Sequence, residues 1–170
     1  TPRSPCTQAR FVFDEPVGIE ETRHYEFKEV TSQKPVRRIA NVAYKYAVAF
    51  LNSEGGRIFW GIRDKDRKVV GLRLDFRQRD KVRRAVTDRL LQIRPAIAPT
   101  DYRIEFHQVC NNDGEAITDL YVVEMSVPRV DTRDLYFSAG GTAYVKTDAG
   151  KRKLTGPEIQ QEILKRHKDG

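Results

Sequence analysis

Three carboxylates stand at places where the sequence predicts the beginning or the end of a strand. Glu21 and Glu26 flank the start of a predicted strand over residues 24–30, and Asp64 follows the short apolar run 57–62. Strand ends from one sheet could bring all three to a single rim, where their oxygens would suit a hard cation such as Mg²⁺ or Mn²⁺. Such a cation could activate water and neutralise charge on a scissile phosphate. The alternative is a solvated acidic surface.

The separation of Glu21 from Glu26 limits how the two could meet. A five-residue step is in phase with neither a strand nor a helix. We therefore expect Glu21 to reach the site from a turn or from a bend in the backbone.

Nucleotide hydrolysis and nucleophilic catalysis are disfavoured by the residues present. The segment AGKRK has Gly150 and Lys151, but a phosphate-binding loop needs Gly where Val145 stands and Ser or Thr where Arg152 stands. No ATP site is therefore expected. No serine lies in a nucleophile elbow, and neither cysteine has a recognisable reactive context.

A zinc site is also not expected. His107 and Cys110 have a spacing that zinc sites use, but a closed structural site needs four ligands, and Cys6, His24 and His167 are distant in sequence. The sequence favours a strand with a buried Cys110 instead. Two cysteines make no disulfide framework, which favours a reducing compartment. We expect a cytoplasmic protein, with the nucleus left open.

The positive charge is concentrated in one segment. The chain of 170 residues has a net charge of +7, and residues 65–94 alone hold 11 Lys and Arg against four Asp. A basic segment of this kind indicates either a phosphate-bearing partner or a solvated helix face. The length predicts one domain, and no apolar run is long enough to cross a membrane. The first residues lack a Met and an apolar core, which we interpret as the start of a fragment rather than a signal peptide.

The elements that must position these residues follow from hydrophobic periodicity. Tyr25 and Phe27 alternate along the first strand, which places Glu26 and Lys28 on its opposite face. The pattern overall predicts an α+β fold, with a mostly antiparallel or mixed sheet and about three helices. The expected helices are 36–51, 75–93 and one that begins near Thr155; the expected strands are 11–13, 24–30, 57–62, a return strand 69–72 that pairs with 57–62, a hairpin of 102–109 with 118–127, and a hairpin of 135–138 with 142–147.

Two stretches carry a resemblance to a known family. The segments ETRHYEFKE and AFLNSEGGRIFWGIRDKDRKVVGL resemble the signature of the Schlafen AlbA-like domain, and GTAYVKTDAGKRKLTGPEI resembles its closing hairpin and terminal helix. The resemblance spans about residues 20–165 and is greatest to small members with a single Schlafen-type lobe. It implies an N-terminal extension over residues 1–19 and a Schlafen AlbA-like domain over 20–168.

The resemblance implies a function as well. Catalytic members of the family are metal-dependent endoribonucleases that act on tRNA and other small structured RNA precursors. Their two glutamates and one aspartate correspond to Glu21, Glu26 and Asp64 here, which implies an enzyme that uses Mg²⁺ or Mn²⁺. The zinc site of larger members has no counterpart in this sequence.

The expected partners are RNA and a second lobe. Larger members place two lobes in tandem, so this single lobe implies a homodimer or a complex with another Schlafen-type lobe. A non-catalytic RNA-binding or assembly subunit and, more weakly, a DNA-binding module of the AlbA kind remain as alternatives. The residues expected to contact RNA are Lys28, Arg77, Lys81, Arg84, Lys146, Lys151, Arg152 and Lys153.

Overall fold

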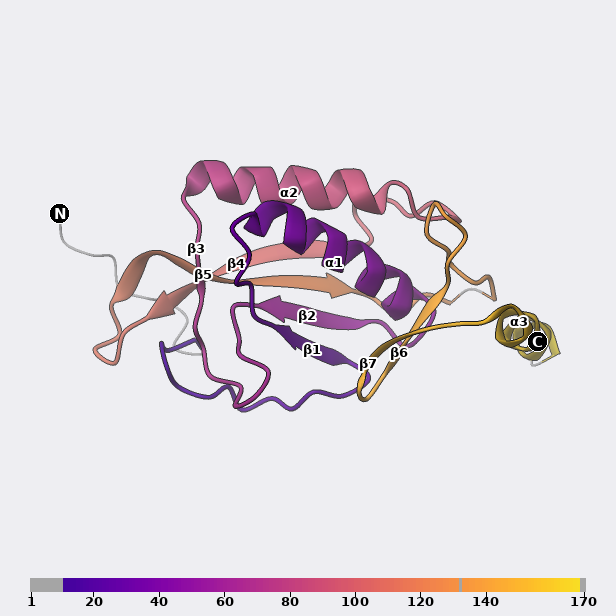
Figure 1. Ribbon diagram of the computed structural model, residues 1–170, viewed down its shortest axis with the longest axis horizontal. Helices are drawn as coiled ribbons and strands as arrows, with labels where there is room; N and C mark the ends of the chain where they lie inside the picture. The colour runs from indigo at the N-terminus through magenta and orange to yellow at the C-terminus, as the bar shows by residue number, and fades with distance from the viewer. Residues whose placement is uncertain (1–10, 132, 169–170) are drawn as a thin grey trace.

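A five-stranded mixed sheet lies at the centre of the molecule, in a computed structural model that describes residues 11–131 and 133–168 (Figure 1). β5 is its longest strand and pairs with β2 and β3 along one edge and with β4 along the other. β1 adds to β2 in parallel. The fold is therefore α+β, as the sequence predicts. The strands are β1 (Tyr25–Lys28), β2 (Gly56–Trp60), β3 (Leu72–Arg73), β4 (Arg103–Cys110), β5 (Ala116–Val127), β6 (Tyr144–Thr147) and β7 (Gly150–Lys153).

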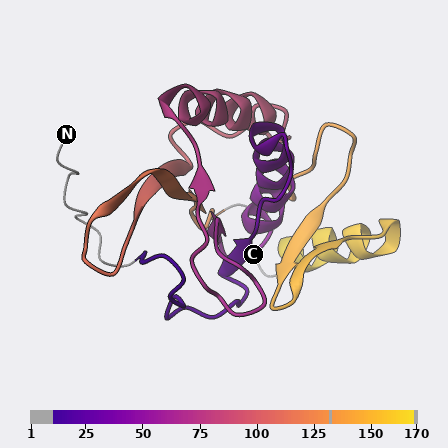
Figure 2. The ribbon, with the colours of Figure 1, turned by 60° about the vertical axis from the view of Figure 1, so that its left-hand side comes forward.

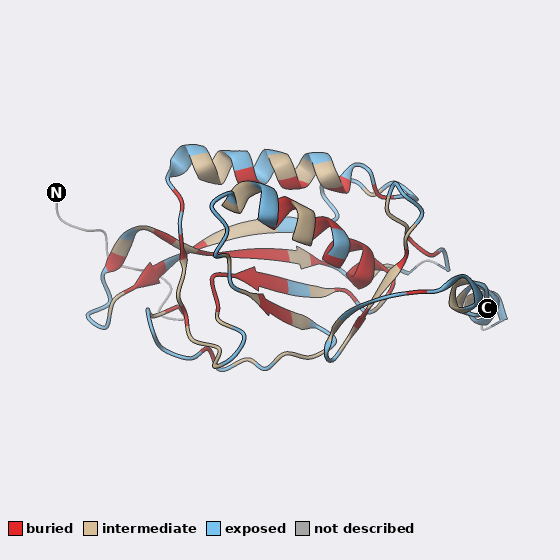
Figure 3. Ribbon diagram, viewed as in Figure 1, coloured by how far each residue is buried: buried red, intermediate tan, exposed pale blue. Residues whose placement is uncertain are grey.

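Two helices, α1 (Pro35–Leu51) and α2 (Phe76–Leu90), cover one face of this sheet. The inner side of α2 is buried and its outer side exposed, as its sequence periodicity predicts (Figure 3). Asp75 caps α2, because its carboxylate accepts a hydrogen bond from the amide of Gln78 while the Gln78 side chain accepts one from the amide of Asp75. Within the described residues, no helix combines the length and the hydrophobicity needed to span a bilayer.

The opposite face of the sheet is covered by the segment 11–19. Phe11 and Val17 are buried there against Phe27 and Phe59. The predicted strand 11–13 is wrong, because this segment makes a single bridge, between Val12 and Cys110, and then turns away. The predicted strand with a buried Cys110 is confirmed, and this cysteine is disulfide-bonded.

The return strand pairs differently from the prediction. Val69 makes only an isolated bridge with Ile62, and β3 pairs with β5 instead of β2. The chain can turn so tightly because Gly61 and Gly71 both have positive φ, and a Cβ at Gly61 would lie 3.0 Å from the Gly71 Cα. This turn carries Asp64 back along the edge of the sheet.

An arm made of β6, β7 and α3 (Gly156–Lys168) lies beside α1 and extends away from the sheet (Figure 2). The predicted hairpin of 135–138 with 142–147 is wrong, because β6 pairs with β7. Buried Asn52 joins the arm to the end of α1: its Nδ2 donates to the carbonyls of Tyr136 and Tyr144 at 2.9 Å, and its Oδ1 accepts from the Tyr136 amide. As predicted, Thr155 and Glu158 form the cap of α3.

Candidate active site

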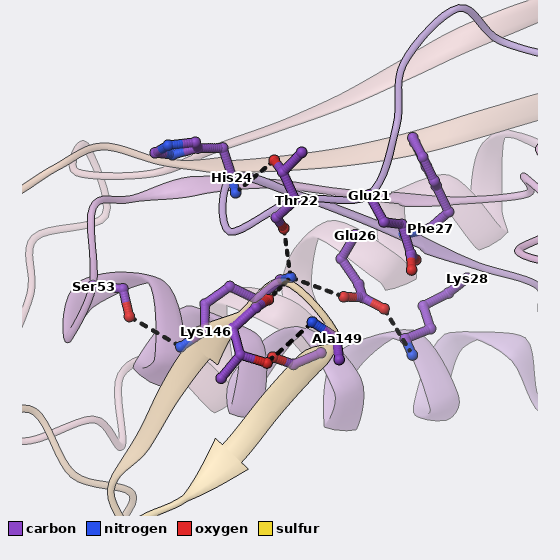
Figure 4. Close-up of polar contacts among 11 residues, drawn as sticks. Glu21, Thr22, His24, Glu26, Phe27, Lys28, Ser53, Lys146 and Ala149 are labelled. Atoms are coloured by element: carbon purple, nitrogen blue, oxygen red, sulfur yellow. Dashed lines mark hydrogen bonds and ion pairs between the residues drawn. The ribbon is translucent and has the colours of Figure 1, made fainter.

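Glu26 is a buried carboxylate held between two lysines. Its place in β1, opposite Ile58 of β2, turns it toward α1 and the arm, and the residue is only 3% exposed. Its Oε1 lies 3.2 Å from the Nζ of Lys28 and its Oε2 lies 3.2 Å from the Nζ of Lys146 (Figure 4). The Lys146 contact is an ion pair without hydrogen-bond geometry, so Oε2 is a buried acceptor with no hydrogen-bond donor.

Lys146 reaches this position from β6 of the arm. Its side chain is 0% exposed, and its Nζ donates to the carbonyls of Thr22, at 2.8 Å, and Thr147, at 2.7 Å. The expectation of a surface lysine that contacts RNA therefore needs correction, because the ammonium faces Glu26 inside the protein. This burial was not predictable from the sequence, because Lys146 lies in a short alternating segment where a long cation normally faces solvent.

Glu21 lies on the turn that precedes β1, as its spacing from Glu26 requires. Its Oε1 accepts a hydrogen bond of 3.0 Å from the amide of Phe27. Burial raises the pKa of Glu21 from 4.5 to about 7; the Phe27 amide opposes this rise, while the charge of Glu26 and the neighbouring Asp64 carboxyl add to it. Near neutral pH Glu21 is therefore partly protonated.

Asp64 is exposed at the rim and lies close enough to Glu21 to form a hydrogen bond with it when one of the two is protonated. The structure thus brings Glu21, Glu26 and Asp64 into one neighbourhood. Among the described residues, however, these three do not form a group whose ligand atoms all lie within 4.8 Å of one another. A cation at this site would fit the donor chemistry in two respects: it would replace the proton on Glu21, and it would give the unsatisfied Oε2 of Glu26 a partner.

Basic residues surround these carboxylates on the side of α1 and β7. Burial lowers the pKa of Lys151, and the charges of Lys45, Lys28 and Arg38 lower it further, which places these four cations close together. Arg38 and Lys45 were not predicted as site residues, because nothing in their spacing connects α1 with β7. We call this group the basic rim; it consists of Lys28, Arg38, Lys45 and Lys151.

The basic segment on α2 is arranged differently. Arg79 and Arg83 lie over the rings of Tyr121 and Phe106, at 4.5 and 4.6 Å from the ring centroids, and so belong to the packing of the helix on the sheet. The residues expected to contact RNA, Arg77, Lys81 and Arg84, are exposed on its outer side. Of the remaining two expected residues, Arg152 pairs with Glu158 and Lys153 is exposed.

A second group of ligand-type side chains lies on the other face of the sheet. Glu105, His107 and Glu124 offer three donor atoms within 4.8 Å of one another, and this group could hold a metal ion. From the sequence, His107 was a candidate metal ligand only together with Cys110. The alternation of Glu105 and His107 on one predicted strand was the available signal, because it places both on one face.

The family model for "Schlafen, AlbA_2" matches residues 21–155, which include all three carboxylates and β6 of the arm. The chain belongs to the Schlafen AlbA_2 family. Membership of the Schlafen AlbA_2 family suggests a function related to nucleic acids, since the family includes nucleases.

A solved structure supports the fold of this Schlafen AlbA_2 chain. The DIP2311 protein from Corynebacterium diphtheriae matches over 82% of this chain with a TM-score of 0.54 and 16% sequence identity. This chain spans only 23% of the length of that one. The similarity therefore concerns the architecture of the domain.

Proposed function

We propose that this chain is a metal-dependent endoribonuclease domain that cleaves tRNA or small structured RNA precursors. Glu21, Glu26 and Asp64 would hold Mg²⁺ or Mn²⁺ and form the active site. The observation that carries the proposal is the proximity of Glu21, on a turn, to Glu26 of β1 and to Asp64 of a loop, since both of these carboxylates raise its pKa. The bound cation would supply a nucleophilic water and neutralise charge on the scissile phosphate.

The chain's own residues would do three things in this reaction. Lys146 places a cation beside the buried Glu26 carboxylate, because its ammonium lies 3.2 Å from Oε2. The amide of Phe27 fixes one oxygen of Glu21 and leaves the other for a ligand. Lys28 is 34% exposed and lies at the boundary between Glu26 and solvent, where it can meet a phosphate oxygen of the substrate.

RNA would lie along the basic rim. Four cations beside an acidic centre attract a polyanion and leave its scissile phosphate as the group nearest the carboxylates. Contacts of this kind are made to the backbone, which suits recognition of an RNA by its shape.

The second candidate is a non-catalytic RNA-binding or assembly subunit. The observation that favours it is the pairing of Glu26 with both Lys28 and Lys146, which balances the buried carboxylate with cations of the chain itself. In that case the basic rim would bind RNA, and the carboxylates would have a structural role only.

Cleavage assays distinguish the two candidates. Labelled tRNA and small-RNA precursors are incubated with the protein in Mn²⁺, Mg²⁺ or EDTA, alongside Glu21→Gln, Asp64→Asn and the matched control Glu29→Gln, an exposed carboxylate at the end of β1. Metal-dependent cuts that disappear in the first two variants and persist in the control support the nuclease. RNA binding without cuts under all conditions supports the subunit.

A further inference from the structure

Glu105 and Glu124 are two carboxylates that face each other directly across β4 and β5. Like charges directly opposite in an antiparallel pair are destabilising. Glu124 is almost fully buried, with 2% of its side chain exposed, which makes its negative charge costly unless a cation lies nearby. His107, two residues after Glu105 on the same strand and the same face, points its Nε2 toward both carboxylates.

One oxygen of each carboxylate is directed inward, and an arginine lies near the other oxygen. The Nε2 of His107 lies 2.9 Å from Oε1 of Glu124 and 3.7 Å from Oε2 of Glu105. The opposite oxygens are approached by Arg57, 2.9 Å from Oε2 of Glu124, and by Arg103, 4.0 Å from Oε1 of Glu105. Metal ligands are commonly oriented by such outer contacts.

The spacing of the three inward atoms is close to that of a coordination shell. Zinc ligands at about 2.0–2.2 Å in a tetrahedron lie about 3.4 Å from one another. The two separations of His107 bracket this value, and all three atoms lie within 4.8 Å of one another. Small side-chain rotations of Glu105, the most exposed of the three, would complete the shell.

Access to the group is open on one side. Glu105 and Arg57 line a cavity of about 410 Å³ together with residues of the segments 100–103 and 126–128. On the other side, the ring of Phe11 stacks on His107 with centroids 5.0 Å apart, which fixes the plane of the imidazole. The group therefore has a rigid base of two neighbouring strands and a route for an ion from solvent.

We propose that Glu105, His107 and Glu124 form a binding site for a first-row divalent transition-metal ion such as Zn²⁺, with further positions open toward the cavity. An imidazole with two carboxylates selects such an ion over Mg²⁺, which prefers oxygen ligands alone. Binding requires a neutral His107, whose Nε2 would then bind the ion in place of its hydrogen bond with Glu124. The site lies on the opposite face of the sheet from Glu26, and it does not depend on the proposed nuclease function.

Zn²⁺ titration by calorimetry, on chelator-treated full chain without a purification tag, tests the proposal. In a Glu21→Gln background, which removes a ligand of the proposed active-site cation, we expect one Zn²⁺ per chain and a melting temperature that rises with Zn²⁺ concentration. His107→Gln should abolish both effects, and Glu105→Gln should weaken binding at least about tenfold.

The matched control is His24→Gln, which removes an exposed histidine 3.3 Å from Glu54 outside the group. It should bind Zn²⁺ as the Glu21→Gln background does. If His107→Gln does not fold, as judged by circular dichroism, the half-exposed Glu105→Gln decides the result. Absence of stoichiometric binding to the folded Glu21→Gln background, or equal affinity in this background with and without Glu105→Gln, would overturn the proposal and leave His107 as the centre of an ion-pair network.

Discussion

At the scale of single residues, Glu21 determines how the candidate active site responds to pH. Its pKa in the folded chain, about 7, lies above its ordinary value of 4.5. Between these two values the folded chain binds more protons than the unfolded chain. Without a cation, stability should therefore fall as pH rises from about 4.5 to about 7, with the effect complete above that range.

The same proton competes with a cation. We expect the apparent affinity for Mn²⁺ to decrease by up to about tenfold for each pH unit below the pKa of Glu21, because one proton must leave before the metal binds. Calorimetric Mn²⁺ titrations from pH 5.5 to pH 8, roughly spanning the range of that pKa, check this. Glu21→Gln should show weaker binding with a flatter pH profile, and an unchanged profile in that variant would contradict the role given to Glu21.

Lys146 gives a second prediction at this scale. Lys146→Met removes the cation next to buried Glu26 and the donor to two carbonyls, so we expect it to destabilise the fold by about 3 kcal/mol. Lys153→Met, an exposed change on the neighbouring strand, should stay within about 0.5 kcal/mol of wild type. Urea unfolding measures both. In combination with Glu26→Gln the cost of Lys146→Met should shrink, and strict additivity would show that the pair is not coupled.

The sequence predicted part of this residue-scale picture. The sequence correctly predicts that Glu21 lies on a turn before the first strand and that Asp64 follows an apolar strand, because strand alternation and chain turns are local properties. The partner of Glu26 could not, because Lys146 comes from a strand 120 residues away that pairs with neither β1 nor β2. Burial of a lysine is a tertiary effect that overrides the usual preference of this residue for solvent.

At the scale of elements, the helices were predictable and the strand partners were less so. Val82, Val86, Leu90 and Ile93 are buried as the periodicity of the second helical segment predicts. The pairing of β4 with β5 also follows from the NNDG turn between them, but their register does not, because it shifts between Gln108 and Cys110. The partner of β3 depends on distant contacts, namely the Gly61–Gly71 approach and the edge of β5, which periodicity does not contain, whereas β6 pairs with the adjacent strand β7.

The element-scale prediction concerns which helix faces RNA. The basic rim borders the carboxylates, whereas α2 lies beyond α1 and uses several arginines for packing (Figures 1 and 2). Changing Arg38, Lys45 and Lys151 together to Ala should weaken binding to all RNAs similarly and reduce the slope of log affinity against log salt by about 2. Fluorescence anisotropy at several salt concentrations measures this slope.

The comparison variant is the triple change of Arg77, Lys81 and Arg84 to Ala on α2. It removes the same formal charge, but from the more basic segment. If RNA binding depended only on total charge, the two triple variants would lose the same affinity. We expect a smaller loss of affinity and a smaller change in slope. A larger effect of the α2 variant would move the RNA-binding surface to that helix.

At the scale of the whole molecule, buried contacts attach the arm to the domain. Asn52 and Lys146 join it to α1 and to the active-site turn. A two-stranded ladder such as β6 and β7 has little stability of its own. The position of the arm and the arrangement of the carboxylates should therefore depend on each other, since Lys146 belongs to both.

The last prediction is that this Schlafen AlbA_2 chain pairs with a second lobe. α3 has no buried residue along Gly156–Lys168, and Leu164 is 64% exposed on a helix that extends away from the sheet (Figure 2). Exposed apolar side chains on a projecting helix are typical of a contact surface. We expect sedimentation at micromolar concentrations to show a dimer, and Leu164→Glu to shift it at least tenfold toward monomer while circular dichroism stays unchanged. Phe76→Glu, which changes an equally exposed apolar residue on α2, serves as the control. If the chain is a strict monomer that nevertheless cuts RNA, and Leu164→Glu cuts at the same rate, a single lobe is sufficient and the pairing is absent.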